Sequence, residues 1–278
     1  MDIEYSPDGS SMAIGSRDRK IWLRKVLDGG IIRTFKGHSS TIYDIEFSNR
    51  GDFIVSGSHD KSARLWYLDG RPGKILGKVV DWVWHVTISY DDQYVAFTSF
   101  DNDIQIARVR DGSSQSHGWG HWGIAYSPTE PLLAISLPYA GNGGINLYTM
   151  DDLTHIDREF PESTEIVDTI VFSDDGSLLM ATSSYTGFWV WDVGTGENIF
   201  GFSGRSLSVN VAGFSPDSGL MAVVYDDQIT IWNLLDGTML YSMPIPFASA
   251  TSVDFSPDGL YLAVGFMDGT VRIYGVAP

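Results

Sequence analysis

Three features of this sequence could support chemistry: a glycine-rich run, a pair of histidines and several acidic pairs. Residues 118–123 read Gly-Trp-Gly-His-Trp-Gly and match the G-x-G-x-x-G pattern of dinucleotide-binding loops. Such a loop needs a strand before it and a helix after it, so that backbone amides and the helix N-terminus meet a pyrophosphate. Here the run precedes an apolar strand, residues 124–126, and no helical period follows. We therefore interpret it as a loop and expect no cofactor.

The two histidines, His117 and His121, are four residues apart, a spacing that brings metal ligands together on a helix. In a loop the same spacing places nothing on a common face, and a catalytic zinc site needs a third protein ligand. The chain has no cysteine, so thiolate ligands and disulfides are excluded. We interpret His117 as a residue that ties a loop to a strand, and we predict no metal site.

The acidic pairs are residues 91–92, 174–175 and 226–227, all aspartates. Paired carboxylates can perform acid–base catalysis, but these pairs fall in expected turns, where Asp accepts hydrogen bonds from nearby amides. The sequence has no D-x-D-x-D-G calcium loop and no G-x-S-x-G nucleophile elbow. We predict that the chain is not an enzyme.

Composition narrows the possible partners. The chain carries 35 acidic and 18 basic residues, and its formal net charge of −17 repels phosphate backbones, so nucleic acid is not an expected partner. No window approaches the length of apolar sequence that crosses a bilayer, and residues 1–4 lack the basic start of a signal peptide. We expect no membrane association. The lack of cysteine fits a reducing compartment, and the predicted location is cytoplasmic.

The elements that must position these residues repeat along the chain. An aromatic or aliphatic residue followed by serine recurs with the serines at positions 6, 48, 89, 127, 173, 215 and 256. In five units an aspartate follows this serine by 11 or 12 residues, as Asp60 follows Ser48. Short apolar runs alternate with turns between these marks. Seven units of about forty residues predict a β-propeller, because one unit alone leaves two apolar faces in water.

The predicted fold class is all-β: a seven-bladed β-propeller of four-stranded antiparallel blades. We expect one domain, residues 1–278, with blades at 1–40, 41–80, 81–118, 119–165, 166–206, 207–248 and 249–278. The last blade lacks its outer strand in this sequence, which leaves residues 271–274 as an unpaired edge open to association. Because the chain starts inside its first unit, we also expect a truncated product or a piece of a longer protein.

His38, Ser56, Asp60 and Trp66 make the second unit resemble a complete repeat of the WD-repeat family. Trp191-Asp192 resembles the dipeptide that closes such repeats, and the resemblance covers essentially the whole chain. It implies that His38, Ser56, Asp60 and Trp66 form a structural hydrogen-bond chain from loop to strands, complete in the second unit only. It also implies a scaffold that binds a protein or a peptide.

In a propeller of that family, the loops entering the inner strands share one face with the turns between second and third strands. The residues of this sequence expected to bind a partner there are Arg17, Tyr43, His59, Trp84, Phe100, Trp122 and Tyr225. Trp82, Trp119 and Tyr139 are expected close by. Trp, Tyr and Arg often dominate binding energy, because they bury a large area at low entropic cost. The predicted function is therefore recognition of a protein or peptide by an aromatic face.

Two alternatives stay open. The chain could be a sensor or regulatory domain of a larger multidomain signalling protein, which its abrupt start favours. It could also be a metal-dependent hydrolase with a site in the central channel. That reading would need acidic and amide side chains on several inner strands, such as Asp44, Asp168 and Asn210.

Overall fold

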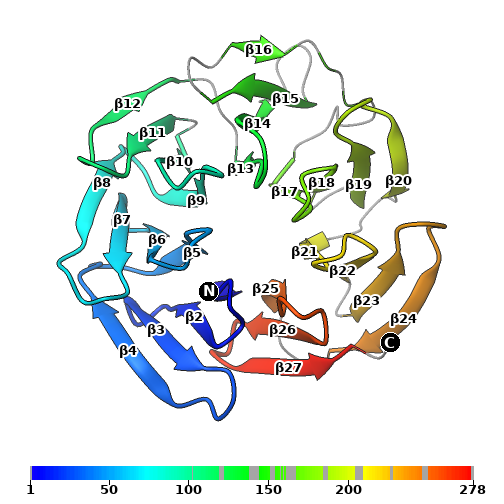
Figure 1. Ribbon diagram of the computed structural model, residues 1–278, viewed down its shortest axis with the longest axis horizontal. Helices are drawn as coiled ribbons and strands as arrows, with labels where there is room; N and C mark the ends of the chain where they lie inside the picture. Colours follow the sequence, from blue (N-terminus) through cyan, green and yellow to red (C-terminus); the bar gives the residue numbers. More distant parts are fainter. Residues whose placement is uncertain are drawn as a thin grey trace. The chain divides into compact units, whose positions relative to one another are not determined.

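The computed structural model consists of β-strands joined by turns and loops (Figure 1). It describes residues 2–101, 103–118, 122–137, 144–150, 154–156, 158, 160, 167–183, 187–203, 209–225, 228–245 and 250–276. Within these ranges there is no helix that could span a membrane.

The sheets confirm the predicted fold class. Seven antiparallel sheets form the blades of a seven-bladed β-propeller; six have four strands and the last has three. Each sheet is a meander, in which every strand pairs with its neighbour in sequence. The chain divides into two compact units, Met1–Ile124 and Ala125–Pro278, which are described separately.

The first unit contains three four-stranded sheets. Their strands are β1 (Asp2–Tyr5), β2 (Ser11–Gly15), β3 (Lys20–Lys25), β4 (Ile31–Lys36), β5 (Ile42–Phe47), β6 (Phe53–Ser58), β7 (Ser62–Tyr67), β8 (Lys74–Lys78), β9 (Val83–Ile88), β10 (Tyr94–Ser99), β11 (Ile104–Arg108) and β12 (Ser114–Ser116). We call the first strand of each sheet its inner strand.

The second unit contains three four-stranded sheets and the three-stranded one. Their strands are β13 (Ile124–Tyr126), β14 (Leu132–Leu137), β15 (Gly144–Thr149), β16 (His155–Ile156), β17 (Thr169–Phe172), β18 (Leu178–Ser183), β19 (Gly187–Asp192), β20 (Asn198–Ser203), β21 (Val209–Phe214), β22 (Leu220–Tyr225), β23 (Gln228–Asn233), β24 (Met239–Pro244), β25 (Ala250–Phe255), β26 (Tyr261–Phe266) and β27 (Val271–Gly275).

The recurring serine closes the hairpin between the first two strands of a sheet. After β5, the Ser48 hydroxyl accepts hydrogen bonds from the amides of Asp52 (2.9 Å) and Phe53 (3.1 Å). Gly51 has a φ of +70° and donates its amide to the Ser48 carbonyl at 2.8 Å. The serine is buried in all seven sheets. A short hydroxyl at this position therefore satisfies amides that the tight turn would otherwise bury unpaired.

Apolar side chains fill the space between successive sheets of each unit. In the first unit, Ile21 and Phe35 from one sheet pack with Ile42 and Ile54 from the next. In the second unit, Trp191 is fully buried and belongs to a cluster with Phe160 and Phe172. A thin sheet with two apolar faces is stable only when both are covered, which explains why the units stack.

The inner strands of the first unit also meet through carboxylates. In β1, Asp2 accepts the amide of Ile45 at 3.0 Å and Glu4 accepts the amide of Phe47 at 2.6 Å. Both donors lie in β5, the inner strand of the next sheet. An inner strand has only one neighbour in its own sheet, so its other edge needs acceptors from elsewhere.

The same contacts recur between the second and third sheets. Asp44 of β5 accepts the amide of Val86 at 2.7 Å, and Glu46 accepts the amide of Ile88 at 3.0 Å. Both donors are in β9. Alternate residues of one strand point to the same side, so an Asp-x-Glu pattern supplies two acceptors in line.

Two of these carboxylates, Asp2 and Glu46, have pKa values above the ordinary range. Burial raises the pKa of Glu46 to about 8; the Ile88 amide opposes the shift, and the charge of Asp44 adds to it. Burial likewise raises the pKa of Asp2 well above its ordinary value, and the charge of Asp44 contributes in the same direction. The folded protein therefore retains protons on Asp2 and Glu46 at pH values where the unfolded chain has lost them.

Because Glu46 retains its proton in the folded state, the free energy of unfolding depends on pH. Because the folded-state pKa of Glu46 is above its ordinary value of 4.5, its contribution is complete below that value and is lost as the pH rises through about 8. Glu46→Gln keeps an acceptor for Ile88 and has no proton to lose. We expect this variant to exceed the wild type in free energy of unfolding at pH 9 by on the order of 2 kcal/mol, with a smaller difference at pH 5.

Urea denaturation at both pH values measures this difference. Glu197→Gln is the matched control, because Glu197 is exposed beyond β19. Equal losses of stability between pH 5 and pH 9 in wild type and Glu46→Gln would contradict the assignment.

Candidate functional site: an aromatic cluster

Six ring-bearing side chains of the first unit touch one another in a continuous set, here called the aromatic cluster: Tyr43, His59, Trp82, Trp84, Phe100 and Trp122. Trp82 contacts three other rings of the cluster. Its ring centroid is 4.1 Å from that of His59, 5.6 Å from Phe100 and 6.2 Å from Tyr43.

Trp84 joins the other side of the cluster. Its ring centroid is 5.0 Å from that of Tyr43 and 6.4 Å from those of Phe100 and Trp122. Phe100 and Trp122 stack at 5.7 Å with an interplanar angle of 14°. Phe100 is 44% exposed and the other five are partly buried, so the rings support one another and still meet solvent.

Two β-bulges aim the strand-borne rings of this cluster. Between β5 and β6, Ile42 pairs with Ser58 and Asp44 with Gly57, so Tyr43 has no partner. Between β9 and β10 a corresponding register shift skips Trp84. A bulge places an extra residue on one strand and turns its side chain away from the regular alternation. Tyr43 and Trp84 therefore project together from neighbouring inner strands.

Backbone hydrogen bonds hold the loops that carry the remaining rings. The amide of His59 donates to the Thr41 carbonyl at 2.9 Å, and the amide of Phe100 donates to the Trp82 carbonyl at 3.0 Å. The Thr98 hydroxyl donates to the Trp122 carbonyl at 3.0 Å. The first two bonds join a turn to the segment entering an inner strand, and the third joins β10 to the segment that contains Trp122. The cluster is thus pre-formed on fixed elements.

Of the seven residues predicted to bind a partner, five belong to this cluster: Tyr43, His59, Trp84, Phe100 and Trp122. Arg17 lies exposed in the turn after β2. Burial raises the pKa of the Tyr43 hydroxyl, and the positive charge of Arg17 opposes the shift. Arg17 therefore contributes a positive charge beside the rings.

The seventh predicted residue, Tyr225, ends β22 in the second unit, where its ring lies 5.9 Å from that of Phe202. Trp119, His121 and Tyr139 lie outside the described residues. Trp82 is predicted only near the face, yet its ring contacts those of Tyr43, His59 and Phe100 within the cluster. Its position between a loop and a bulged strand gives no periodic signal.

His38, Ser56, Asp60 and Trp66 are joined by three hydrogen bonds. The Trp66 indole N–H donates to Ser56 Oγ at 2.8 Å, and Ser56 lies 2.7 Å from His38 Nε2. Trp66 can only donate, so the Ser56 hydroxyl donates to His38 Nε2. His38 Nδ1 then carries the proton and donates it to Asp60 Oδ2 at 2.9 Å. These bonds link Trp66 in β7 and Ser56 in β6 to His38 in the loop before β5. His38 in turn bonds to Asp60 in the turn between β6 and β7.

The electrostatics of this set fix its protonation. Burial lowers the pKa of His38, and the bond to Asp60 opposes the shift. Burial acts against ionisation of Asp60, but hydrogen bonds from His38, Ser62 and the Ser39 amide outweigh it and hold the pKa of Asp60 well below its ordinary value. A neutral His38 beside an ionised Asp60 matches the direction of donation.

The other candidates for chemistry have structural partners. Asp91 and Asp175 accept the amides of Gln93 and Ser177, each at 3.0 Å, as expected of turn aspartates. His117 is exposed and, among the described residues, its ring does not repeat the bonds of His38. Residues 226–227 lie outside the described part of the chain.

The proposed channel ligands do not form a metal site among the residues described. Asp44 accepts the Val86 amide and lies 3.4 Å from His85 Nδ1. Asp168 precedes β17, and the side chain of Asn210 lies outside the described residues. Within that described set, no three His, Cys, Asp or Glu side chains are grouped as metal ligands would be.

Comparison with known proteins agrees with this fold. Residues 29–67 and 239–275 match the family model described as "WD domain, G-beta repeat". The chain is also similar to the β-propeller domain of Cps50 (Swd1) from Myceliophteria thermophila. That match has a TM-score of 0.88 at 16% identity and covers 100% of this chain and 97% of the other.

Several WD-repeat proteins are similar over most of the chain. Pre-mRNA-processing factor 19 homolog 2 of Arabidopsis thaliana is 25% identical over 99% of this chain and 54% of its own length. Periodic tryptophan protein 2 of the same plant is 32% identical over 98% of this chain, which spans 40% of that protein. Small ribosomal subunit protein RACK1y of Oryza sativa subsp. japonica is 24% identical over 88% of this chain and 77% of its own length.

The chain thus spans about half the length of the first two relatives. The resemblance to the WD-repeat family is confirmed: the chain carries WD40 repeats and folds as a β-propeller.

The buried His38–Asp60 pair generates a prediction about pH. Both pKa values are lower in the folded state, so the stability from this pair is present at neutral pH. It is lost as the pH falls below about 6.5 for the histidine and about 4 for the aspartate. Asp60→Asn should reduce the free energy of unfolding at pH 7 by about 2 kcal/mol, because it weakens a bond to a buried ring.

Because the charge of Asp60 opposes the lowering of the His38 pKa, the same variant should lose at least as much stability as the wild type between pH 7 and pH 4. It should lose less between pH 4 and pH 2, where the wild type loses the contribution of the Asp60 carboxylate. Asp268→Asn is the control, since Asp268 occupies the corresponding turn and accepts the Thr270 amide and hydroxyl. Thermal unfolding across this range supplies the comparison. A control as destabilised as Asp60→Asn would argue against a special role for the His38 contact.

Proposed function

We propose that the chain is a non-enzymatic recognition platform that binds a protein or peptide partner at the aromatic cluster. The observation that carries the proposal is the contact between six rings drawn from two bulged strands, two turns and two strand-entry loops. Clusters of aromatic side chains with partial exposure are typical of the central residues of protein interfaces.

The rigidity of the cluster supports this role. Binding costs free energy whenever side chains or loops must be ordered, and these rings are already fixed by mutual packing and by bonds such as Thr98 to Trp122. Trp and Tyr lose few rotamers for the area they cover. A partner that inserts an apolar side chain against Phe100 and Trp84 would gain contact without a large entropic loss.

The polar surroundings suggest the kind of partner. The cluster offers ring faces for apolar side chains, and Arg17 offers an adjacent cation for a carboxylate. We propose a peptide segment that presents an apolar or aromatic anchor. Tyr225, at the end of β22 in the second unit, stays a separate prediction that the proposed site at the cluster does not include.

The names of two relatives are consistent with work inside assemblies. RACK1y is named as a small ribosomal subunit protein, and another relative as a pre-mRNA-processing factor. We propose protein contacts, not contacts to nucleic acid, for this chain, because its net charge is −17.

A phage-displayed library of random peptides, selected on the immobilised chain, tests the proposal. We expect the recovered peptides to carry aromatic or large aliphatic residues, and to bind Trp84→Ala and Trp122→Ala about thirtyfold more weakly than wild type, the loss of ~2 kcal/mol typical of a central interface residue. Affinity is measured by fluorescence anisotropy with the synthetic peptides.

Trp22→Ala is the matched control, because Trp22 is a partly buried tryptophan of β3 that bonds to Asp18 and makes no contact with the cluster. It should bind like wild type. Selected peptides that bind Trp84→Ala and Trp122→Ala with unchanged affinity would place the binding surface elsewhere and overturn the proposal.

A further inference from the structure

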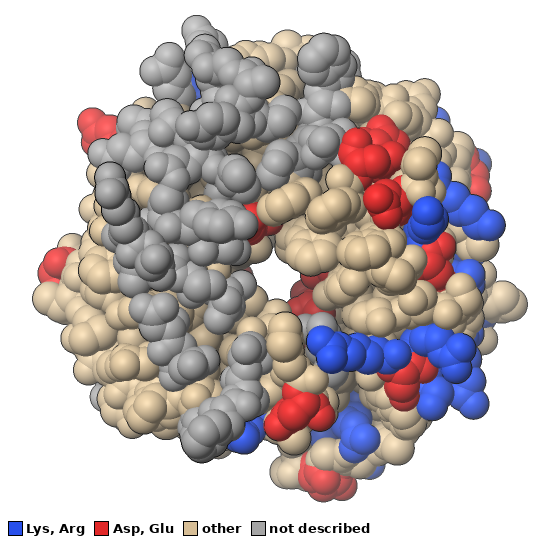
Figure 2. Space-filling model, turned by 180° about the vertical axis from the view of Figure 1, so that it is seen from behind, with Lys and Arg blue, Asp and Glu red and all other residues tan. Residues whose placement is uncertain are grey.

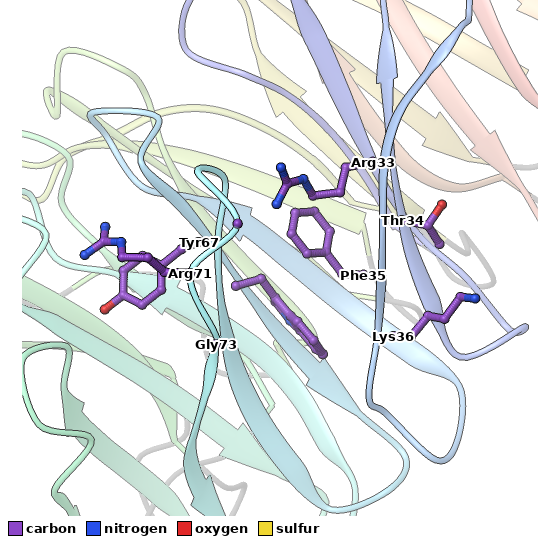
Figure 3. Close-up of a pocket in the computed structure, with 9 residues that line it drawn as sticks. Arg33, Thr34, Phe35, Lys36, Tyr67, Arg71 and Gly73 are labelled. Carbon is purple, nitrogen blue, oxygen red and sulfur yellow. The ribbon is translucent and has the colours of Figure 1, made fainter.

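A hollow lies in the first unit, between β4 and the turn that joins β7 to β8 (Figure 3). It has a volume of about 310 Å³, and we call it the β4 groove. The residues that matter for its chemistry are Arg33, Phe35, Lys36, Trp66, Tyr67 and Arg71.

Aromatic rings form the floor of the β4 groove. Phe35 is buried and its ring centroid is 5.9 Å from that of Trp66. Trp66 is held in turn by its bond to Ser56. On the far side, Arg71 stacks over the Tyr67 ring at 4.1 Å. The floor is therefore stiff and apolar, a surface on which an aliphatic stem can pack.

Cations surround that floor. In Figure 3, Arg33 and Phe35 point toward Tyr67, whereas Thr34 and Lys36 point the other way. The Arg33 guanidinium lies 6.0 Å from the Phe35 ring centroid and against Gly70, where an added Cβ would sit 2.6 Å from its Nη1. No described residue accepts a hydrogen bond from Arg33, so the planar fork of donors is available to a ligand.

One carboxylate, Asp69, adjoins these cations without neutralising them. It accepts from Arg71 Nε at 2.6 Å, and its pKa is lowered first by the Arg71 amide and also by the charges of Arg71 and Arg33. Asp69 and Arg71 are both more than half exposed. The two guanidinium groups of Arg33 and Arg71 against one carboxylate leave the groove positive.

A positively charged groove is unusual in a chain whose formal net charge is −17. Residues 1–124 contain 15 basic and 16 acidic residues, whereas residues 125–278 contain 3 and 19. Figure 2 shows Lys and Arg gathered toward one side of the view, interleaved with Asp and Glu. A local excess of cations in the groove therefore attracts an anion that the rest of the surface repels.

The backbone of β4 adds a second means of recognition. β4 is the last strand of its sheet, and no strand of the described residues pairs with its outer edge. Four successive residues, 33–36, line the groove, so it runs along the length of β4. An exposed edge can accept an extended peptide as an added strand.

We propose that the β4 groove binds an acidic, extended peptide segment of a partner protein, with a carboxylate or phosphate on Arg33 and Arg71. An extended chain matches the free edge of β4, and alternate acidic side chains would reach the cations. A nucleic acid or an anionic bilayer presents many negative charges to the whole surface, and the net charge of −17 opposes both. The site is separate from the aromatic cluster.

Three short synthetic peptides test this site: one alternates Glu with Val, one alternates phosphoserine with Val, and one alternates Gln with Val. Fluorescence anisotropy with the full chain should show salt-sensitive binding of at least one acidic peptide and none of the Gln peptide. The double variant Arg33→Glu/Arg71→Glu should weaken that binding by at least about tenfold, since it removes two charge-assisted contacts. Whichever acidic peptide binds more tightly identifies carboxylate or phosphate as the preferred group.

The matched control is Lys25→Glu/Lys78→Glu, which makes the same change in net charge at two exposed lysines outside the groove. It should retain binding, as should Trp84→Ala, whose behaviour separates this site from the aromatic cluster. Failure of both acidic peptides to bind, or equal losses in the two double variants, would overturn the proposal. So would retention of the chain by phosphatidylserine vesicles in place of the peptides, or salt-sensitive self-association that Arg33→Glu/Arg71→Glu abolishes.

Discussion

Backbone amides on an unpaired strand edge must find acceptors, and this constraint shapes the first unit. β1 and β5 each carry two acidic residues spaced two apart. Their carboxylates accept hydrogen bonds from backbone amides of the next inner strand. The arrangement joins adjacent sheets by directional bonds in addition to apolar packing. It also buries these carboxylates and brings them close together. Burial, with an added contribution from the charge of Asp44, is why Asp2 and Glu46 hold protons more strongly than ordinary acids.

The same inner strands set the position of the aromatic cluster. Their first residues cannot continue the regular pairing. The bulge at Tyr43 comes one residue before Asp44, whose carboxylate joins the sheets, and the bulge at Trp84 comes two residues before Val86, whose amide donates to that carboxylate. Fixing the strand therefore also fixes the ring. Structural and recognition residues are adjacent in one strand, as Asp44 and Tyr43 are in β5. A substitution of Asp44 therefore changes the position of the Tyr43 ring.

The fold was predictable because its signals are periodic. Serines at regular intervals and turn aspartates mark the hairpins, and His38, Ser56, Asp60 and Trp66 identify one complete repeat. Contacts between sheets carry no such period. The sequence therefore favours Asp44 as a possible channel ligand, whereas in the structure it accepts the Val86 amide. The sequence likewise does not indicate that Trp82 belongs to the aromatic cluster. The β4 groove escaped prediction because Arg33 and Arg71 come from different sheets and meet only through packing.

The meander order of every sheet has a consequence for synthesis on the ribosome. Each strand pairs with the one translated just before it, so the contacts within a blade are local in sequence and quick to form. The bonds from Asp2 and Glu4 span 43 residues and cannot close until β5 has emerged. Assembly of the first unit thus advances in steps, because β1 and then β5 expose acceptors that bind the next inner strand to emerge.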